Sequence, residues 1–184
     1  MSVSTTWLRA AALGAATGGR SMTPIATISR AAGRGKLRIR HSPLTFLARP
    51  AVAGILKLMG AGELLVDKLP FVGPRTTPPS LAWRIALGGV CGALVALMDQ
   101  RPTVPRTLCA ASIGAACAAG FSFLLMRIRL SLGQMGLPDP VVGVAEDALV
   151  IATSRAAVGG LRLSSGQRRR RGCRWDRSDS CRHD

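Results

Sequence analysis

The sequence predicts an all-α, polytopic membrane helix bundle of about four to five spans, some of them broken or re-entrant. Of the 184 residues, 48% are hydrophobic and only 18% are charged, whereas soluble domains carry about 25% charged residues. Residues 107–126 form an uncharged apolar segment that is long enough to cross the hydrocarbon layer as a helix. The formal net charge of +16 is concentrated in connecting segments and in the tail, as is typical of basic segments beside membrane spans.

Five apolar segments are expected to form the spans. They are residues 4–28, 44–66, 80–98, 107–126 and 141–161. The connector 69–79 contains four prolines, which end helices because proline lacks an N–H and clashes with the preceding turn. Glycine and proline residues within 127–140 predict a polar turn ahead of the last span.

The chain is expected to form one multi-pass membrane domain, residues 1–161, followed by a disordered Arg-rich tail, residues 162–184. The excess of Lys and Arg in short loops places the basic loop 30–42 and the tail in the cytoplasm, with the N-terminus outside. If the first span is re-entrant or interfacial, the N-terminus lies inside instead. The rival interpretation of the first span is a transit peptide, because it is rich in Arg, Ser and Thr and has no acidic residue.

Small residues recur at four-residue spacing in three spans. The pairs are Gly14 and Gly18, Gly88 and Gly92, and Gly114 and Ala118. This spacing places both members of a pair on one helix face, so that helix backbones approach closely. The simpler alternative is that Gly and Ala are abundant enough to give such pairs by chance.

Charged residues of both signs lie in or at the edges of the apolar spans. They are Arg20, Lys57, Glu63, Arg84, Glu146, Asp147 and Arg155. A charge at the bilayer centre costs about 2.5–3.5 kcal/mol on insertion scales, so such residues pair with one another, reach the interface or line water. Three interpretations follow: a polar site or pathway, ion pairs that hold helices together, or placement at the interface.

Two details favour a polar site. Pro24 follows Arg20 within the first span and frees a backbone carbonyl, as in the broken helices that line transporter sites. Glu146 and Asp147 are neighbours near the start of the last span. Adjacent carboxylates repel in a low dielectric, which suits proton coupling or cation binding. The alternative role of these two carboxylates is to stabilise a helix N-terminus.

The same residues carry a resemblance to a known family. The blocks are Gly18-Gly19-Arg20-Ser21-Met22-Thr23-Pro24, Gly62-Glu63 with Asp67-Lys68-Leu69-Pro70, Pro74-Arg75-Thr76, Pro78-Pro79-Ser80-Leu81 with Arg84, and Ala145-Glu146-Asp147. Over about residues 7–160, their order and spacing resemble the uncharacterised bacterial membrane proteins of domain-of-unknown-function family 4126. The resemblance implies a small multi-pass membrane protein and no particular activity. The candidate binding residues that it suggests are Arg20, Pro24, Glu63, Asp67, Lys68, Arg84, Glu146 and Asp147.

No catalytic constellation is visible in the sequence. His41 and His183 lie in polar segments, and neither a P-loop nor a dinucleotide-binding glycine motif occurs. We therefore expect no enzymatic activity, no cofactor and no metal. The leading hypothesis is a small transporter or channel-like protein of unknown substrate with an intramembrane polar site. The alternative is a structural or interaction protein in which the same charges form helix-locking ion pairs.

The expected partner is the lipid bilayer, in the bacterial inner membrane. The basic segment Arg30–Arg40 and the C-terminal run Arg168–Arg171 are candidates for contact with anionic lipid. For the C-terminal run the alternatives are RNA binding and, favoured over both, a solvated tail that only fixes the topology. The small-residue faces also suit a homo-oligomer. Nucleic acid is not an expected partner, because aromatic side chains that could stack on bases do not alternate with the basic ones.

Overall fold

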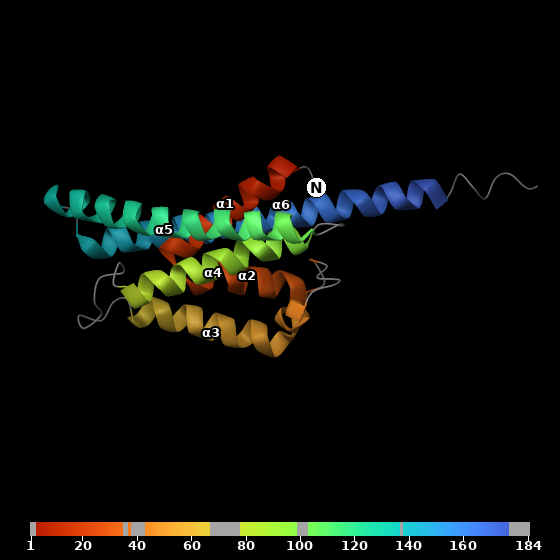
Figure 1. Ribbon diagram of the computed structural model, residues 1–184. Coiled ribbons are helices and arrows are strands. Elements are labelled where there is room, and N and C mark those ends of the chain that lie inside the picture. The colour runs from red at the N-terminus through yellow and green to blue at the C-terminus, as the bar shows by residue number, and fades with distance from the viewer. Residues whose placement is uncertain are drawn as a thin grey trace, which may run out of the picture.

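The computed structural model describes residues 3–34, 37, 43–66, 78–98, 103–136 and 138–176, and most of their side chains up to residue 159. Within these residues every regular element is a helix, which confirms the all-α prediction (Figure 1). The elements are α1 (Val3–Gly19), α2 (Met22–Gly33), the short 3-10 helix η1 (Pro43–Ala48), α3 (Pro50–Val66), α4 (Pro78–Leu97), α5 (Val104–Gln134) and α6 (Asp139–Asp176). From α3 to α6 the long helices run in alternating directions along an elongated bundle (Figure 1).

Two helices, α4 and α5, are long and apolar enough to cross a membrane. With 20 and 31 residues, they span about 30 and 46 Å at 1.5 Å per residue. The predicted polar turn 127–140 is wrong in its first half, because no glycine or proline interrupts the chain before Gly133 and α5 continues to Gln134. The chain turns instead at Gly136, whose φ of 81° lies in the left-handed region that favours glycine.

The first predicted span is two helices that reverse direction at Arg20–Ser21 (Figure 1). α1 runs beside α5, with Gly14 against Gly114. α2 returns beside α3, with Met22 close to Gly60. The segment 4–28 is therefore a broken helical hairpin, and its two outer ends lie at the same end of the bundle (Figure 1).

Small residues bring α1, α4 and α5 into close contact, as their four-residue spacing predicts. A Cβ atom added to Gly14 would overlap the backbone of Gly114. One added to Gly88 would lie 2.6 Å from the Cβ of Ala118, which is far inside van der Waals contact. The three small-residue faces thus meet in one interface, where van der Waals packing between backbones replaces side-chain interdigitation.

Large apolar side chains also cover much of the outer surface. Exposed examples on five helices are Leu8, Ile55, Leu58, Trp83, Leu108, Phe123, Leu124, Leu130, Val144 and Leu149. Scattered exposed apolar residues are normal in soluble proteins, but extended apolar surface marks a binding or membrane-facing region. The exposed surface of this bundle is therefore compatible with a lipid environment.

The division into a membrane domain and a disordered tail stays a prediction. α6 is assigned to Asp176 and so includes part of the predicted tail. The side chains of Arg168–Arg171, and residues 177–184 altogether, lie outside the described part of the chain. The same holds for residues 35–36 and 38–42 of the predicted basic loop.

Candidate functional site

The candidate site is built on the break between α1 and α2. Pro24 has no N–H to bond the carbonyl of Arg20, and its ring would clash with that carbonyl in a continuous helix. The chain therefore breaks at Arg20–Ser21, and Pro24 occupies the first turn of α2, where its missing N–H costs no helical bond. Arg20, Ser21 and Met22 are buried, so the ends of both helices need partners inside the protein.

The N-terminus of α2 is capped by a carboxylate from another helix. Glu63 of α3 accepts hydrogen bonds from the backbone N–H of Ser21 at 2.9 Å and of Met22 at 3.1 Å, one on each carboxylate oxygen. The Ser21 side chain makes no capping bond of its own. A helix N-terminus carries unpaired N–H groups and a partial positive charge. The Glu63 carboxylate accepts hydrogen bonds from two of these N–H groups, and its negative charge interacts favourably with the helix dipole.

The C-terminus of α1 is capped by a cation from a third helix. Arg84 of α4 donates from Nη1 to the carbonyl oxygens of Gly18 at 2.8 Å and Gly19 at 3.0 Å. The hydroxyl of Ser122 in α5 also lies 3.0 Å from the Gly18 carbonyl oxygen. The Nη2 atom of Arg84 lies 3.6 Å from an oxygen of Glu63, so the groups that cap the two helix ends also attract each other.

The fourth charge of the site comes from α6. Asp147 accepts a 2.5 Å hydrogen bond from Nε of Arg20, and the two side chains are only 15% and 5% exposed. We call Arg20, Glu63, Arg84 and Asp147 the polar centre. It joins the helix break to α3, α4 and α6, and its two positive and two negative charges sum to zero. Charges of this kind are retained in an apolar bundle because they are paired and hydrogen-bonded.

The pair Arg20 and Asp147 is expected to show strong energetic coupling. Arg20→Gln or Asp147→Asn alone should lower the free energy of unfolding by about 3 kcal/mol, because each leaves one buried charge without its partner. The double variant should lose less stability than the two single variants lose together, and this difference, the coupling energy, should be about 1–3 kcal/mol.

Reversible unfolding of the purified chain in mixed micelles would measure this coupling. The exposed Arg49 provides the control, since Arg49→Gln combined with Asp147→Asn should be additive. Additive effects for Arg20→Gln and Asp147→Asn would show that the two side chains do not interact in solution.

Glu146 and Asp147 are neighbours in sequence but face different partners. Glu146 is 7% exposed, and one of its carboxylate oxygens lies 3.9 Å from Nη2 of Arg129 in α5. Successive helical residues point about 100° apart, so the two carboxylates are directed to separate cations. The prediction that Glu146 and Asp147 form one site of paired carboxylates is therefore wrong. Nor do the two residues lie in the first turn of α6, which begins at Asp139.

The structure describes six of the eight predicted site residues. Arg20, Glu63, Arg84 and Asp147 come together in the polar centre, Pro24 shapes the break, and Glu146 lies beside the centre. Asp67 and Lys68 lie outside the described residues.

Sequence reasoning missed Ser122, whose hydroxyl lies within hydrogen-bond distance of the carbonyl oxygens of Gly18 and Ala118, and Arg129. The signal that could have found Ser122 is a hydroxyl inside an uncharged span, although Ser112 carries the same signal.

Within the described residues, no group of three or more His, Cys, Asp or Glu side chains is placed to hold a metal ion. The chemistry of the polar centre is ionic and hydrogen-bonding, and its carboxylates and guanidinium groups bind each other or backbone ends. It resembles a substrate site in one respect, since the Glu63 carboxylate occupies the helix N-terminus where an anion would bind.

A family model described as "Domain of unknown function (DUF4126)" matches residues 8–159. The chain belongs to the DUF4126 family. The DUF4126 match covers the whole polar centre and ends before the arginine run of the tail. The description of the DUF4126 family assigns no activity. No similar curated protein and no similar solved structure was found.

Proposed function

We propose that this DUF4126 protein is a small multi-pass protein of the bacterial cell membrane. Two helices long and apolar enough to cross a bilayer support this, as do the large apolar side chains exposed on five helices. In this proposal α3, α4, α5 and α6 cross the membrane and α1–α2 enters it as a re-entrant hairpin. The N-terminus, the basic loop and the tail then share the cytoplasmic side.

We further propose that the protein is a transporter or has a channel-like role, with the polar centre as its moving part. The observation that carries this is the helix break, at which charged side chains from three other helices bind the two helix ends and Arg20. A continuous helix would need none of these buried charges, whose desolvation is costly. Broken helices inside bundles often form the ion and solute sites of transporters.

The geometry supports a simple exchange mechanism. Glu63 binds both the N-terminus of α2 and, at 3.6 Å, the guanidinium of Arg84. An anion that replaced Glu63 at the N-terminus of α2 would free that carboxylate to move toward Arg84. A proton or cation that neutralised Glu63 would loosen the same two contacts. Either event would allow the hairpin to shift relative to α3 and α4.

One observation favours the alternative, a structural or interaction role. The structure describes the side chains of three acidic residues, Glu63, Glu146 and Asp147, and each has a cationic partner. Such pairing suits a set of ion pairs that only hold helices together. Under this alternative, substitutions in the polar centre weaken folding or assembly, and the intact protein carries no flux.

Flux measurements on proteoliposomes separate the two roles. The purified chain would be reconstituted and tested for proton, sodium, potassium, chloride and phosphate flux against protein-free vesicles. We expect at least one flux above the background and a decrease of about tenfold or more in Glu63→Gln, which cannot carry the charge that pairs with Arg84. The control Arg49→Gln, at an exposed position, should keep the flux of the original protein. No flux with any ion, or equal flux in the folded Glu63→Gln variant, would support the structural role.

A further inference from the structure

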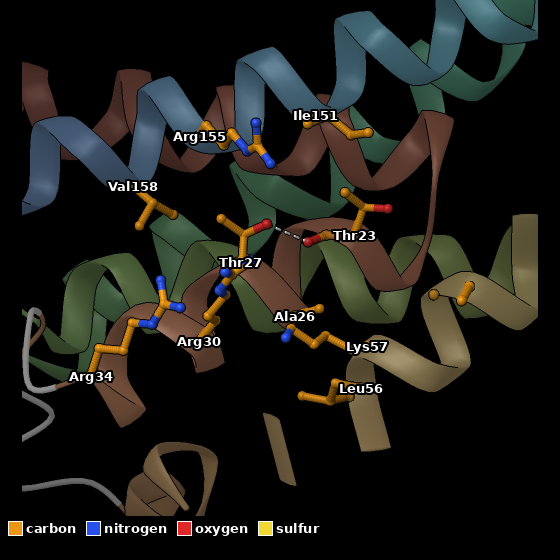
Figure 2. Close-up of a pocket in the computed structure, with 12 residues that line it drawn as sticks. Thr23, Ala26, Thr27, Arg30, Arg34, Leu56, Lys57, Ile151, Arg155 and Val158 are labelled. Carbon is orange, nitrogen blue, oxygen red and sulfur yellow. Dashed lines mark hydrogen bonds between the residues drawn. The ribbon is translucent and has the colours of Figure 1, made fainter. Parts of the chain in front are cut away.

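A cavity of about 540 Å³ lies between α2, α3 and α6, apart from the polar centre. Figure 2 shows the side chains that line it, with Arg155 reaching from α6 toward α2 and Lys57 lying between α2 and α3. The volume is within the range of small-molecule sites, which is about 300–1,000 Å³. The cavity is open on one side, so a ligand has access from the surface.

Four of the residues that line the cavity are cationic. They are Arg30 of α2, Arg34 directly after the end of α2, Lys57 of α3 and Arg155 of α6. In sequence these residues are scattered over two predicted spans and a loop, and only the packing of three helices gathers them. The four cationic residues are exposed to water, and apolar side chains such as Leu56, Ile151 and Val158 complete the lining. Because like charges gathered around one cavity repel one another, an anion between them is favoured.

No acidic side chain described in the structure balances these charges. Glu63, Glu146 and Asp147 are all engaged with arginines outside the cavity. No carboxylate is among the residues that line the cavity. The hydroxyl of Thr27 donates to the carbonyl of Thr23 within α2 (Figure 2) and so offers only an acceptor to a ligand. The cationic groups are therefore the main polar groups that the cavity presents.

We propose that this cavity binds a phosphate-bearing anion, through Arg30, Arg34, Lys57 and Arg155. Guanidinium groups match the oxygens of a phosphate with paired hydrogen bonds, and an ammonium adds a compact charge. An anion with one or two negative charges would relieve the repulsion among four cations. The volume exceeds that of phosphate alone, and the apolar walls suit the glycerol or acyl part of a larger molecule. Two sources share this chemistry: the headgroup of an anionic phospholipid and a soluble phosphate compound.

The inference differs from a general attraction of basic residues to lipid. The sequence predicts that Arg30 and Arg34 contact anionic lipid as part of a basic loop. In the structure Arg30 lies in the last turn of α2 and Arg34 directly follows that helix, and both line one cavity with Lys57 and Arg155. Binding should therefore depend on residues of three helices together. It does not depend on the proposed transport, because none of the four belongs to the polar centre.

Binding would be measured with the full-length chain in a neutral detergent. Three probes would be used: inorganic phosphate, short-chain phosphatidylglycerol and short-chain phosphatidylcholine. The test variant Arg30→Gln/Arg155→Gln removes one cation from each of two helices. The matched control Arg49→Gln/Arg127→Gln removes the same charge from two exposed positions outside the cavity. Since Lys57 is exposed on α3, Lys57→Gln serves as a second variant that tests the site if the double variant does not fold.

We expect the original protein to bind inorganic phosphate, phosphatidylglycerol or both, and the test variant to bind the same probe about tenfold or more weakly. The control should bind as the original protein does. Binding of phosphatidylglycerol alone would identify a lipid headgroup as the ligand, and binding of inorganic phosphate with equal affinity would identify a soluble phosphate. If the protein bound neither inorganic phosphate nor phosphatidylglycerol, the proposal would be overturned. Equal losses of affinity in the test and control variants would also overturn it, since these would reflect net charge alone. Equal binding of phosphatidylcholine and phosphatidylglycerol would overturn it as well.

Discussion

Gly114→Ala is expected to lower the free energy of unfolding by roughly 3 kcal/mol, the upper part of the range for overpacked positions. A Cβ atom at this position would overlap the backbone oxygen of Gly88 and lie 3.2 Å from the Cα of Gly92. Both obstacles belong to the backbone of α4, so no side-chain rotation can relieve them. Because α1 also contacts Gly114 through Gly14, separation of the helices would loosen the packing of three helices at once.

A matched control lies on the same helix. A Cβ atom added to Gly120 in α5 would have no neighbouring atom within 4 Å. Gly120→Ala should therefore be neutral or stabilise the protein by up to about 1 kcal/mol, because alanine favours helix over glycine. Unfolding in mixed micelles, followed by circular dichroism, would compare the two variants. Equal stability of Gly114→Ala and Gly120→Ala would contradict the close contact between α4 and α5.

Arg84→Met is expected to lower the free energy of unfolding by about 3–5 kcal/mol, the cost of removing one partner from a buried ion pair. Arg84 is only 3% exposed. The substitution leaves the carbonyl of Gly19 without the bond from Arg84 and removes the cation beside Glu63. The Gly18 carbonyl keeps the Ser122 hydroxyl as a partner. Hydrogen exchange should show faster opening at the junction of α1 and α2 before the rest of the bundle.

Three further variants test the explanation. Arg84→Lys should recover part of the stability, since an ammonium can bond one helix end but lacks the fork of a guanidinium. Arg127→Met, at an exposed position of α5, should change stability by less than about 0.5 kcal/mol. Arg84→Met combined with Glu63→Met should be less damaging than the sum of the single changes. If Arg84→Met were as stable as Arg127→Met, the proposed capping of α1 would be wrong.

Much of the helical arrangement was predictable from the sequence. The uncharged segment 107–126 lies within α5, and the segment 80–98 corresponds closely to α4. The small-residue pairs in three spans meet as expected, because the spacing of four residues places them on one helix face. Element ends were predicted less well. The turn before α6 begins after Gln134 and not at Arg127, since charge alone does not end a helix.

The candidate site was predictable in its residues but not in its pairing. Mixed charges in apolar spans marked Arg20, Glu63, Arg84 and Asp147, and all four meet in the polar centre. Their partners could not be assigned, since several arginines and carboxylates offered equally plausible pairs. The neighbouring Glu146 and Asp147 illustrate the difficulty, because the rotation between successive helical residues directs them to different cations.

By itself, the sequence determined the helical class, the presence of close helix contacts and the need for a helix break ahead of Pro24. These depend on local properties: apolar length, small-residue spacing and the missing N–H of proline. Only the tertiary structure decided that the chain reverses at Arg20–Ser21, that Glu63 and Arg84 cap the two ends, and that four cations from three segments of the chain line one cavity. Those features join residues far apart in the chain, and their positions follow from how the helices pack.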